Sequence, residues 1–301
     1  MVEKKKGCRR SKRKVDDEIV LNVMYSNIQG FTGKKTCLGY TINSMNADVV
    51  LLAETMCRKV EMNGCHCICP KKSVGQNVAV LLCGKVCAPN KMKLYEPNEV
   101  VNMIGVRVEL YGFGLRFYTA HLKQQSTTSR ADFACQFDEI KNQARSANAG
   151  REPWLLVFDA NVHVGGEVID GCEDKQDWGG KKLLEMVNDE GLTIVNSLDL
   201  CHGIVTRVDP RNGTESSIDL ALCNTFMLQY VVEMEIDEDE KWKMKKYGKK
   251  VTQTDHNTIK VQLKFKRNGS NNTEVTTRYN LKNDEAKVRM QENIMADMDP
   301  E

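Results

Sequence analysis

Short apolar segments recur along the chain, and each has the length of a β-strand. Residues 49–53 and 154–158 are apolar throughout, which indicates strands that are covered on both faces. The predicted strands cover residues 19–27, 48–54, 77–83, 100–110, 115–121, 153–159, 192–197, 217–223 and 257–263.

Helical patterns lie between some of these strands. Residues 37–46 and 129–149 repeat apolar side chains at helical spacing. Residues 179–191 end with Gly191, a residue suited to the position that follows a helix. The predicted strands outnumber the predicted helices, and each helix lies in a separate connection between strands. The pattern therefore predicts an α/β fold, a sandwich of two packed sheets with helices on the outside.

Polarity divides the chain into three parts. Residues 1–17 predict a disordered basic arm, residues 18–267 one folded domain, and residues 268–301 a polar linker. Within the domain, residues 233–250 hold six acids followed by six lysines, a pattern that favours a solvated hairpin or loop.

Charge is unevenly spread. The net charge is +2, yet residues 1–15 hold eight Lys/Arg against one Glu, which leaves −5 for the rest. The arm could bind nucleic acid or serve as a nuclear address, or it could be a solvated leader. The acidic remainder suits a site that gathers carboxylates around a divalent cation.

The cysteine content and the hydropathy of the chain indicate in which cellular compartment the protein resides. No stretch is long and apolar enough to span a membrane, and the amino terminus lacks the apolar run of a secretory signal. We therefore expect the 12 cysteines to be reduced, in the cytosol or nucleus. The cluster Cys65, His66, Cys67 and Cys69 lacks the spacing of a tetrahedral zinc site and favours a cysteine-rich strand or loop.

Polar residues of catalytic type stand at the ends of many predicted strands. Each alone has an ordinary explanation, as a turn cap or a core histidine. If the sandwich stacks these strand ends along one edge, they form a single acidic cleft. They are Asn27, Glu54, His121, Asp159, Asn161, Asp219, Asp255 and His256.

Such a cleft suits phosphate ester chemistry. Glu54 and Asp255 offer the hard oxygen ligands that Mg²⁺ prefers. Asp159 could orient or deprotonate an attacking water. His256 partnered by Asp219 would be fixed in one tautomer, kept protonated, and able to stabilise charge on phosphorus. The remaining side chains could hold phosphate oxygens or position the acid: Asn27, His121 and Asn161. The combination indicates metal-assisted hydrolysis of a phosphate ester.

The ordered motifs resemble a known superfamily. The chain reads "SNIQG", "LLAET", "YTAHL", "FDANVHVG", "GTESSIDLAL" and "TDHNTI" over roughly residues 18–266. This resembles the endonuclease/exonuclease/phosphatase superfamily, which includes deoxyribonuclease I and the abasic-site endonucleases. The resemblance implies a four-layer, deoxyribonuclease I-like α/β sandwich.

Within the superfamily the chain looks most like the amino-terminal endonuclease of non-LTR (LINE-type) retrotransposons. "WLLVFDANVHVG", "GKKLLEMVNDEGLTIVNSL" and "GIVTRVDPRNGTESSIDLAL" are similar to successive segments of those domains. The tail "TTRYNLKNDEAKVRMQ" is similar to their linker toward the reverse transcriptase. The resemblance implies one end of a longer polyprotein.

The resemblance also implies roles for matched residues. The implied metal ligand is Glu54, with Asn27 beside it and Asp255 approaching the metal. Asp159 would activate the water, Asn161 would contact the scissile phosphate, and Asp219 and His256 would form a dyad. His121 falls where relatives carry a phosphate-facing His or Tyr, and Tyr118 competes for that role. Thr206 and Ser217 would lie near the DNA backbone, with Arg207 a weaker candidate.

Two positions depart from the superfamily pattern. Phe158 replaces the usual Gly before the Asp of G-D-x-N, and Ala53 replaces the usual Gln before the metal-binding Glu. The Y-x-P-N motif of the abasic-site branch is absent. These changes bear on efficiency and substrate choice more than on the type of reaction.

The first hypothesis is a Mg²⁺-dependent endonuclease, with Mn²⁺ a second candidate metal, that nicks double-stranded DNA in the nucleus. The nick would leave a 3′-hydroxyl that primes reverse transcription by a fused or associated reverse transcriptase, with no membrane involved. The second hypothesis is another phosphoesterase of the same fold: an inositol-phosphate phosphatase, a sphingomyelinase or an RNA deadenylase. The third is a non-catalytic nucleic-acid-binding module.

Overall fold

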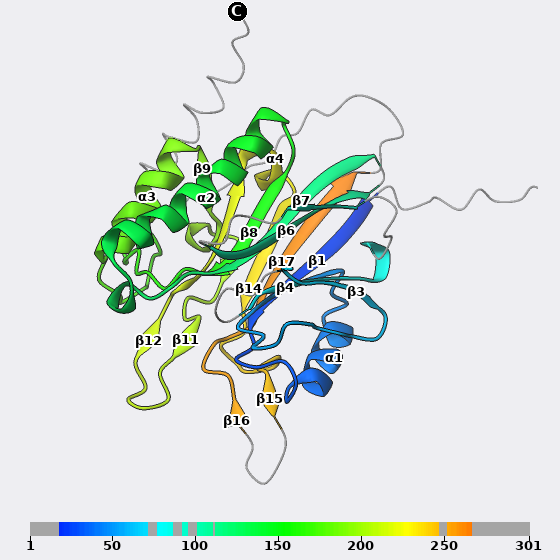
Figure 1. Cartoon of the computed structure of the whole chain (residues 1–301), viewed down its shortest axis with the longest axis horizontal. Helices are drawn as coiled ribbons and strands as arrows, with labels where there is room; N and C mark the ends of the chain where they lie inside the picture. Colours follow the sequence, from blue (N-terminus) through cyan, green and yellow to red (C-terminus); the bar gives the residue numbers. More distant parts are fainter. Residues whose placement is uncertain are drawn as a thin grey trace, which may run out of the picture.

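The computed structural model describes most of the predicted domain (Figure 1). The described residues are 18–71, 77–86, 92–95, 101–110, 112–246 and 252–266. The predicted basic arm (1–17) and linker (268–301) lie outside them. In the described part of the chain no helix combines the length and apolar character that crossing a membrane requires.

The first sheet has seven strands, and the first and last strands of the domain meet at its centre. β1 is antiparallel to β17 and parallel to β2. The order across the sheet is β10 (Cys201–His202), β14 (Val231–Ile236), β17 (Ile259–Lys266), β1 (Glu18–Asn27), β2 (Val49–Ala53), β4 (Ala79–Cys83) and β3 (Cys65–Ile68).

The second sheet has six strands. β7 is parallel to β8, which is antiparallel to β13. The order is β5 (Met92–Tyr95), β6 (Asn102–Leu110), β7 (Phe113–His121), β8 (Trp154–Asp159), β13 (Asp219–Asn224) and β9 (Leu192–Ile194). Two hairpins complete the strands, β11 (Arg207–Val208) with β12 (Glu215–Ser216) and β15 (Lys245–Lys246) with β16 (Thr252–Gln253).

Helices cover the outer faces of both sheets. α1 (Lys35–Ser44) packs against the seven-stranded sheet, while α2 (Arg130–Ala149) and α3 (Trp178–Asp189) lie together on the outside of the six-stranded sheet (Figure 1). The short helix α4 (Thr225–Leu228) follows β13. Within the described residues, 3-10 turns occur at Gly84–Val86, Gln125–Thr127 and Val195–Ser197.

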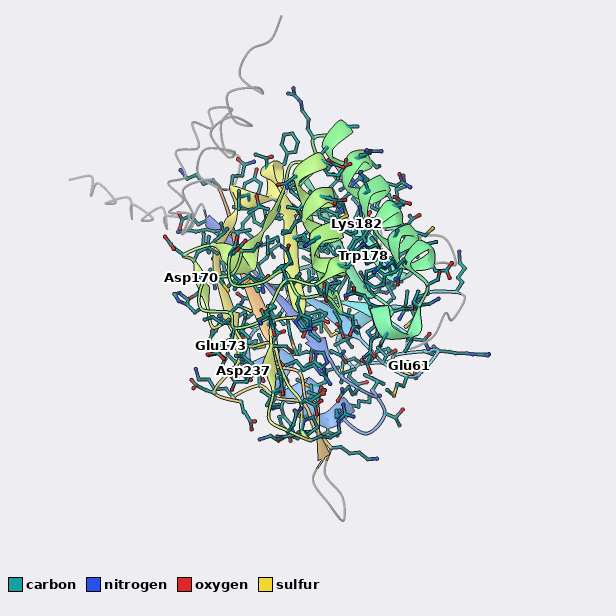
Figure 2. All side chains as sticks on the ribbon, turned by 90° about the vertical axis from the view of Figure 1, so that its left-hand side faces the viewer. Glu61, Asp170, Glu173, Trp178, Lys182 and Asp237 are labelled. Atoms are coloured by element: carbon teal, nitrogen blue, oxygen red, sulfur yellow. A yellow bond between two sulfur atoms is a disulfide. The ribbon has the colours of Figure 1, made fainter. Side chains whose placement is uncertain are left out.

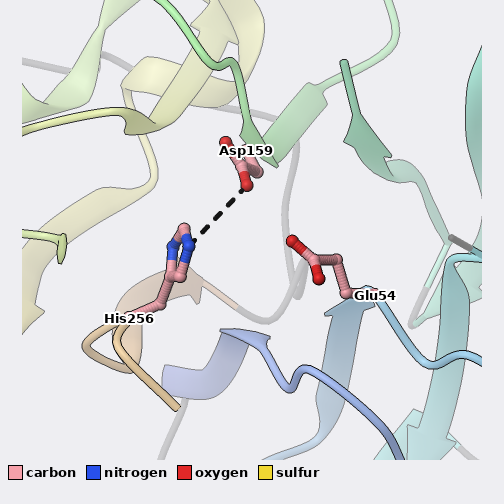
Figure 3. Close-up of side chains that lie close together, drawn as sticks. All are labelled: Glu54, Asp159 and His256. Atoms are coloured by element: carbon pink, nitrogen blue, oxygen red, sulfur yellow. Dashed lines mark ion pairs between the residues drawn. The ribbon is translucent and has the colours of Figure 1, made fainter. Parts of the chain in front are cut away.

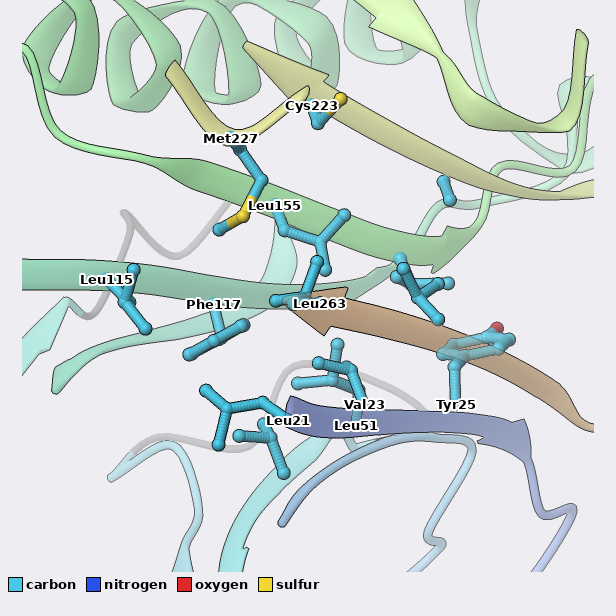
Figure 4. Close-up of a cluster of buried hydrophobic side chains, with 14 of the residues drawn as sticks. Leu21, Val23, Tyr25, Leu51, Leu115, Phe117, Leu155, Cys223, Met227 and Leu263 are labelled. Atoms are coloured by element: carbon cyan, nitrogen blue, oxygen red, sulfur yellow. The ribbon is translucent and has the colours of Figure 1, made fainter. Parts of the chain in front are cut away.

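Strand alternation divides the core into three apolar layers. Successive side chains of a strand point to opposite faces, so Leu155 and Val157 pack between the sheets while Leu156 packs toward the helices. Figure 4 shows the layer between the sheets, where Phe117 and Leu155 of one sheet face Leu21 and its neighbours of the other. The predicted four-layer α/β sandwich is confirmed.

Two expectations need correction. Residues 233–236 belong to β14, where Met234 and Ile236 are buried, rather than to a solvated loop. The Cys-rich segment does form a strand, β3, but Cys65 is joined to Cys83 of β4 in a disulfide, so these two cysteines are not reduced thiols. The pair stands directly opposite across neighbouring strands, which brings the two sulfur atoms within bonding reach.

The topology explains how distant segments meet. In a parallel pair both carboxyl ends lie at the same edge, so β1 with β2, and β7 with β8, each end together. β13 and β17 run antiparallel to these strands and begin at that edge. The ends of six strands, from both sheets, therefore surround the mouth of the layer between the sheets.

Candidate active site

The predicted polar residues converge at this mouth. β8 ends at Asp159, which stands opposite both His121 of β7 and Asp219 of β13. From the other sheet, Asn27 ends β1 and Glu54 follows β2 directly. These residues are spread over the chain from position 27 to position 219, and the packing of the two sheets brings them together.

Asn27 lies at the centre of the cluster. Its Nδ2 donates to Glu54 Oε1 and to Asp159 Oδ2, each at 2.9 Å. The same nitrogen lies 3.4 Å from Nε2 of His256. Its Oδ1 is buried and has no hydrogen-bond partner among the residues that the structure describes. A buried amide oxygen without a donor is costly to retain, and it is a hard ligand of the kind that a divalent cation prefers.

The arrangement fits a small divalent cation. Ligand atoms of Glu54, Asp159 and His256 all lie within 4.8 Å of one another. Figure 3 shows how the three side chains point toward one another. Together with Asn27 Oδ1, the carboxylates form an oxygen-rich donor set suited to Mg²⁺ or Mn²⁺. Glu54 and Asn27, both predicted from sequence, are the residues best placed to hold the metal.

His256 is held by a buried carboxylate. Its Nδ1 lies 2.7 Å from Asp219 Oδ2, and the Tyr25 hydroxyl donates to Asp219 Oδ1 at 2.7 Å. Both oxygens of Asp219 are thus engaged. With Nδ1 bonded to Asp219, Nε2 of His256 faces Asp159 Oδ2 at 3.9 Å. The predicted dyad is present in the geometry, with the tyrosine as a third member.

Burial and charge shift the pKa values of the facing pair. Burial, reinforced by the Asp219 carboxylate, raises the pKa of Asp159 to about 6. Burial lowers the pKa of His256, but the Asp219 carboxylate outweighs that effect and brings it to about 9. At neutral pH the site therefore places a proton-accepting carboxylate beside an imidazolium.

His121 bridges two acids at the other side of the cluster. Its Nε2 lies 3.3 Å from Glu54 Oε1 and 3.7 Å from Asp159 Oδ2. Burial lowers the pKa of His121, but the hydrogen bond to Glu54 outweighs burial and the net shift is upward. Burial in turn raises the pKa of Glu54, and hydrogen bonds from His121 and Asn27 reverse this to a net lowering. The two carboxylates that face the His121 ring thus favour its protonated form.

Asp255 is tied to the protein on both oxygens. Gln29 Nε2 donates to Asp255 Oδ1, and Arg207 Nε donates to Oδ2 at 2.9 Å. Its Oδ1 also lies 3.7 Å from Nε2 of His256. Asp255 therefore lies at the site, as predicted, and its oxygens accept from Gln29 and Arg207. Arg207 reaches the site through this contact.

Backbone strain is concentrated here. Gln29, Glu54, Met56 and Asn161 all have positive φ angles, between 43° and 51°. Non-glycine residues rarely adopt this conformation, and they hold it where the surrounding structure fixes it. At Glu54 the turn re-aims the side chain that follows the buried run of β2 toward the cluster.

Asn161 supports the carboxylate of Asp159. Its backbone N–H donates to Asp159 Oδ1 at 3.1 Å, and its Nδ2 donates to the Leu122 carbonyl at 2.8 Å. The residue therefore joins the ends of β7 and β8 and lies within the site as predicted.

Three predicted residues do not face the site. Tyr118 lies three positions before His121, on the opposite face of β7, and its hydroxyl donates to Gln143 of α2 at 3.1 Å. Thr206 and Ser217 are buried, so DNA cannot touch them where they lie. Thr206 Oγ1 instead accepts the backbone N–H of Asp219 at 3.0 Å and so positions the dyad.

Sequence reasoning missed three contributors near the site. Tyr25 and Gln29 flank Asn27, and Lys34 donates to the carbonyls of Ile28 and Gln29 at 2.8 and 2.9 Å. A usable signal exists for Tyr25 because it lies two positions before Asn27, on the same face of β1. No comparable signal marks Lys34, whose ammonium reaches back from the start of α1.

The two residues that depart from the superfamily pattern, Phe158 and Ala53, point into apolar layers because side chains alternate between the faces of a strand. Phe158 is buried on the helix-facing side of the six-stranded sheet, opposite to its neighbour Asp159. Ala53 is buried between the sheets. Neither change displaces a polar side chain of the cluster.

Comparison with known proteins defines the fold. No family model matches the chain, and no curated protein sequence matches it. Solved structures do match. The endonuclease domain of TRAS1, a telomere-specific non-LTR retrotransposon, superimposes with a TM-score of 0.59 at 18% identity, over 81% of this chain and 98% of that one.

Two further matches have different activities. The 3′ phosphatase NExo from Neisseria, bound to a product DNA hairpin, gives a TM-score of 0.61 at 14% identity, over 81% of this chain and 99% of that one. The mannosyl-6-phosphatase Bt3783 of Bacteroides thetaiotaomicron gives 0.55 at 15%, over 80% and 98%. The chain therefore has the deoxyribonuclease I-like fold of endonuclease/exonuclease/phosphatase proteins, whose members here are nucleases and phosphatases.

Proposed function

We propose that the chain is a divalent-metal-dependent phosphoesterase, and specifically an endonuclease that nicks double-stranded DNA. The observation that carries the proposal is the facing pair of Asp159 and the His256–Asp219 dyad, beside Asn27 and Glu54. A carboxylate that accepts a proton and an imidazolium that stabilises negative charge are the two groups that phosphate ester hydrolysis requires.

Each side chain has a distinct task in the reaction. Asp159 accepts a proton from the attacking water, since its raised pKa makes it a better base than an exposed carboxylate. Nε2 of His256 donates a hydrogen bond to a non-bridging phosphate oxygen as charge builds on phosphorus. Asp219 and Tyr25 fix the ring in the orientation that this requires.

The metal site lies on the other side of Asp159. A divalent cation held by Glu54 and Asn27 Oδ1 would supply positive charge to the phosphate and the leaving oxygen. His121 lies beside Glu54 and holds that carboxylate in place. Water attack from the Asp159 side breaks the bond between phosphorus and the 3′ oxygen. That oxygen takes up a proton from solvent, so the products are a 3′-hydroxyl and a 5′-phosphate.

The retrotransposon assignment rests on the sequence segments and the fold together. The resemblance to LINE-type domains includes Asn196, whose side chain donates to the Asp219 carbonyl at 3.2 Å and accepts from the Ala221 N–H at 2.8 Å. This asparagine holds the strand that carries Asp219. In this proposal the nick primes reverse transcription in the nucleus by a reverse transcriptase that is fused to the domain or acts with it. The linker motif that supports this lies outside the described residues.

Nicking of supercoiled plasmid tests the proposal. The wild-type chain is compared with His256→Ala and Asp159→Asn, in Mg²⁺, in Mn²⁺ and in chelator. The expected result is metal-dependent nicking that both variants lose. Extension of the nick by a DNA polymerase, without prior phosphatase treatment, checks for the 3′-hydroxyl. Metal-dependent hydrolysis of sugar or inositol phosphates without any nicking would instead assign a small-molecule phosphatase.

A further inference from the structure

The hairpin formed by β15 and β16 leads directly into the site. β16 ends at Gln253, and His256 follows three residues later. Between them, Thr254 Oγ1 donates to the Asn27 carbonyl at 2.8 Å. Lys246 pairs with Thr252 of β16 across the hairpin. The few residues that lead from β16 to His256 include Thr254, which is hydrogen-bonded to β1.

The base of this hairpin is anchored in the core. Met244 is fully buried against the α1 layer, and the Lys245 N–H donates to Cys37 Sγ of α1 at 3.4 Å. Asp237, marked in Figure 2, accepts the backbone N–H groups of Lys241 and Trp242. The described part of the hairpin is therefore held in a defined position relative to the site.

Lys246 lies against the loop that carries Gln29. Carbon atoms of its side chain approach within 3.1 Å of where a Cβ on Gly33 would stand. The Lys246 side chain therefore lies directly over Gly33 in this loop. The ammonium of Lys246 also contributes to the lowered pKa of Lys34, whose first cause is burial, so both lysines share this corner of the site.

The lysines of this region differ in whether they form ion pairs. The acids that precede β15 pair with Lys241, which contacts Glu235 and Asp239, and with Lys243, which contacts Glu240. Among the described residues, Lys246 of β15 forms no ion pair, whereas its neighbour Lys245 adds to the effect of Lys243 in lowering the pKa of Glu240.

The acidic site creates a need for such cations. The mouth holds the carboxylates of Glu54, Asp159, Asp219 and Asp255, which repel a polyanion. Lys34, Arg207 and Lys246 lie at the loop of residues 28–34. Lys34 is buried on backbone carbonyls and Arg207 is engaged by Asp255, whereas Lys246 is exposed. A single scissile phosphate is served by the metal, but a polynucleotide brings further phosphates that need their own counter-charges.

We propose that Lys246, with Lys245 next to it on the same hairpin, contacts the phosphate backbone of double-stranded DNA beside the scissile phosphate. This inference rests on the proposed endonuclease function and extends it, because it assigns the phosphate backbone of a polynucleotide to a surface beside the catalytic cluster. The lysines carry charge to backbone phosphates without reading base edges, so they set affinity and register rather than sequence preference.

The salt dependence of DNA binding tests this surface. Binding of duplex DNA is measured in chelator at several salt concentrations for the wild type and for Lys245→Ala/Lys246→Ala. The plot of log affinity against log salt is expected to become shallower by about 0.9 for each phosphate that the protein no longer neutralises. Lys245→Arg/Lys246→Arg should retain the wild-type slope. Lys181→Ala is the matched control, on the outer helix α3 that Figure 2 marks with Trp178 and Lys182.

Activity assays separate this surface from the catalytic proposal. The double alanine variant should raise KM for plasmid nicking while the metal-dependent hydrolysis of bis(p-nitrophenyl) phosphate stays at the wild-type rate. An unchanged salt slope in a chain that nicks normally overturns the lysine surface alone. A weakened affinity for RNA with unchanged DNA binding also overturns it. Absence of nicking by the wild type overturns the endonuclease proposal, and absence of duplex binding overturns the surface with it.

Discussion

Asp219 and His256 form a buried pair at 2.7 Å, and the carboxylate is held on its other oxygen by the hydroxyl of Tyr25. The three residues come from β13, from the turn before β17 and from β1, so both sheets contribute. The orientation of the imidazole therefore depends on a tyrosine that the sequence pattern presents as an ordinary core residue.

Loss of the tyrosine hydroxyl should impair catalysis without affecting DNA affinity. Tyr25→Phe leaves a buried oxygen of Asp219 without its donor and loosens the imidazole. We expect kcat for nicking to fall about tenfold, equivalent to roughly 1.4 kcal/mol in the barrier, with KM unchanged. Tyr118→Phe is the matched control, because that hydroxyl faces α2. An equal loss in both variants would contradict a specific role for Tyr25.

The charged dyad should give stability that depends on pH. The folded-state pKa of His256 is raised to about 9 from an ordinary value of 6.5. Its contribution is therefore fully present below pH 6.5 and is lost as the pH rises through about 9. In chelator, the difference in Tm between wild type and His256→Gln should narrow from pH 7 to pH 10. A difference in Tm that stays constant from pH 7 to pH 10 would contradict a charged dyad.

At neutral pH the Asp159 carboxylate should lower the stability of the folded protein, whereas the His256 imidazolium raises it. Because its folded-state pKa is raised to about 6, its contribution is present below 3.8 and lost as the pH rises through about 6. Metal-free Asp159→Asn should therefore have a higher Tm than the wild type at pH 7.5, yet no nicking activity. A lower Tm at both pH 7.5 and pH 4 would show that the carboxylate is not strained by its surroundings.

Metal binding should be visible without any turnover. A ligand that binds the folded state alone raises the free energy of unfolding by RT ln(1 + [L]/Kd), which is about 2.7 kcal/mol at a hundredfold excess over Kd. Mg²⁺ should thus raise the Tm of the wild type and raise that of Glu54→Gln much less. Glu185→Gln, on the outer helix α3, should respond as the wild type does. Equal shifts in all three proteins would place the metal elsewhere.

Lys34 should support the site through the backbone. Its ammonium binds the carbonyls of Ile28 and Gln29, and Gln29 holds Asp255 from a strained conformation. We expect Lys34→Met to lower kcat about tenfold, or roughly 1.4 kcal/mol, while KM for DNA stays constant, since the buried lysine cannot meet substrate. Lys34→Arg keeps the positive charge but changes the shape of the side chain, so it shows which of the two properties supports catalysis. A rise in KM alone would instead indicate a direct contact with DNA.

Much of the site was predictable because strand ends are visible in sequence. Asn27, Asp159 and Asp219 follow or begin strongly apolar strands, and alternation places each on the face between the sheets. The same alternation explains why Tyr118 is misplaced: three positions from His121 on one strand means the opposite face. β14 was missed because Glu233 and Glu235 interrupt its apolar pattern and a shift in register disturbs its alternation.

Contacts between loops were beyond the reach of the pattern. The burial of Thr206 and Ser217 depends on how the β11–β12 hairpin folds over β13, and the bond from Gln29 to Asp255 joins residues 226 positions apart. No local periodicity records such pairings. The disulfide between Cys65 and Cys83 was likewise hidden, because only the pairing of β3 with β4 makes the two cysteines neighbours.

Because β1 pairs with β17, the active site can be completed only late in synthesis of the chain. Asn27 and Glu54 leave the ribosome early, whereas Asp219 and His256 emerge late, and the sheet that positions His256 closes only when β17 docks beside β1. A nascent chain that carries the metal-binding half thus lacks the imidazolium and its carboxylate. Under the proposed function, an interrupted translation product would be harmless to DNA, and cutting would begin only once the domain is whole.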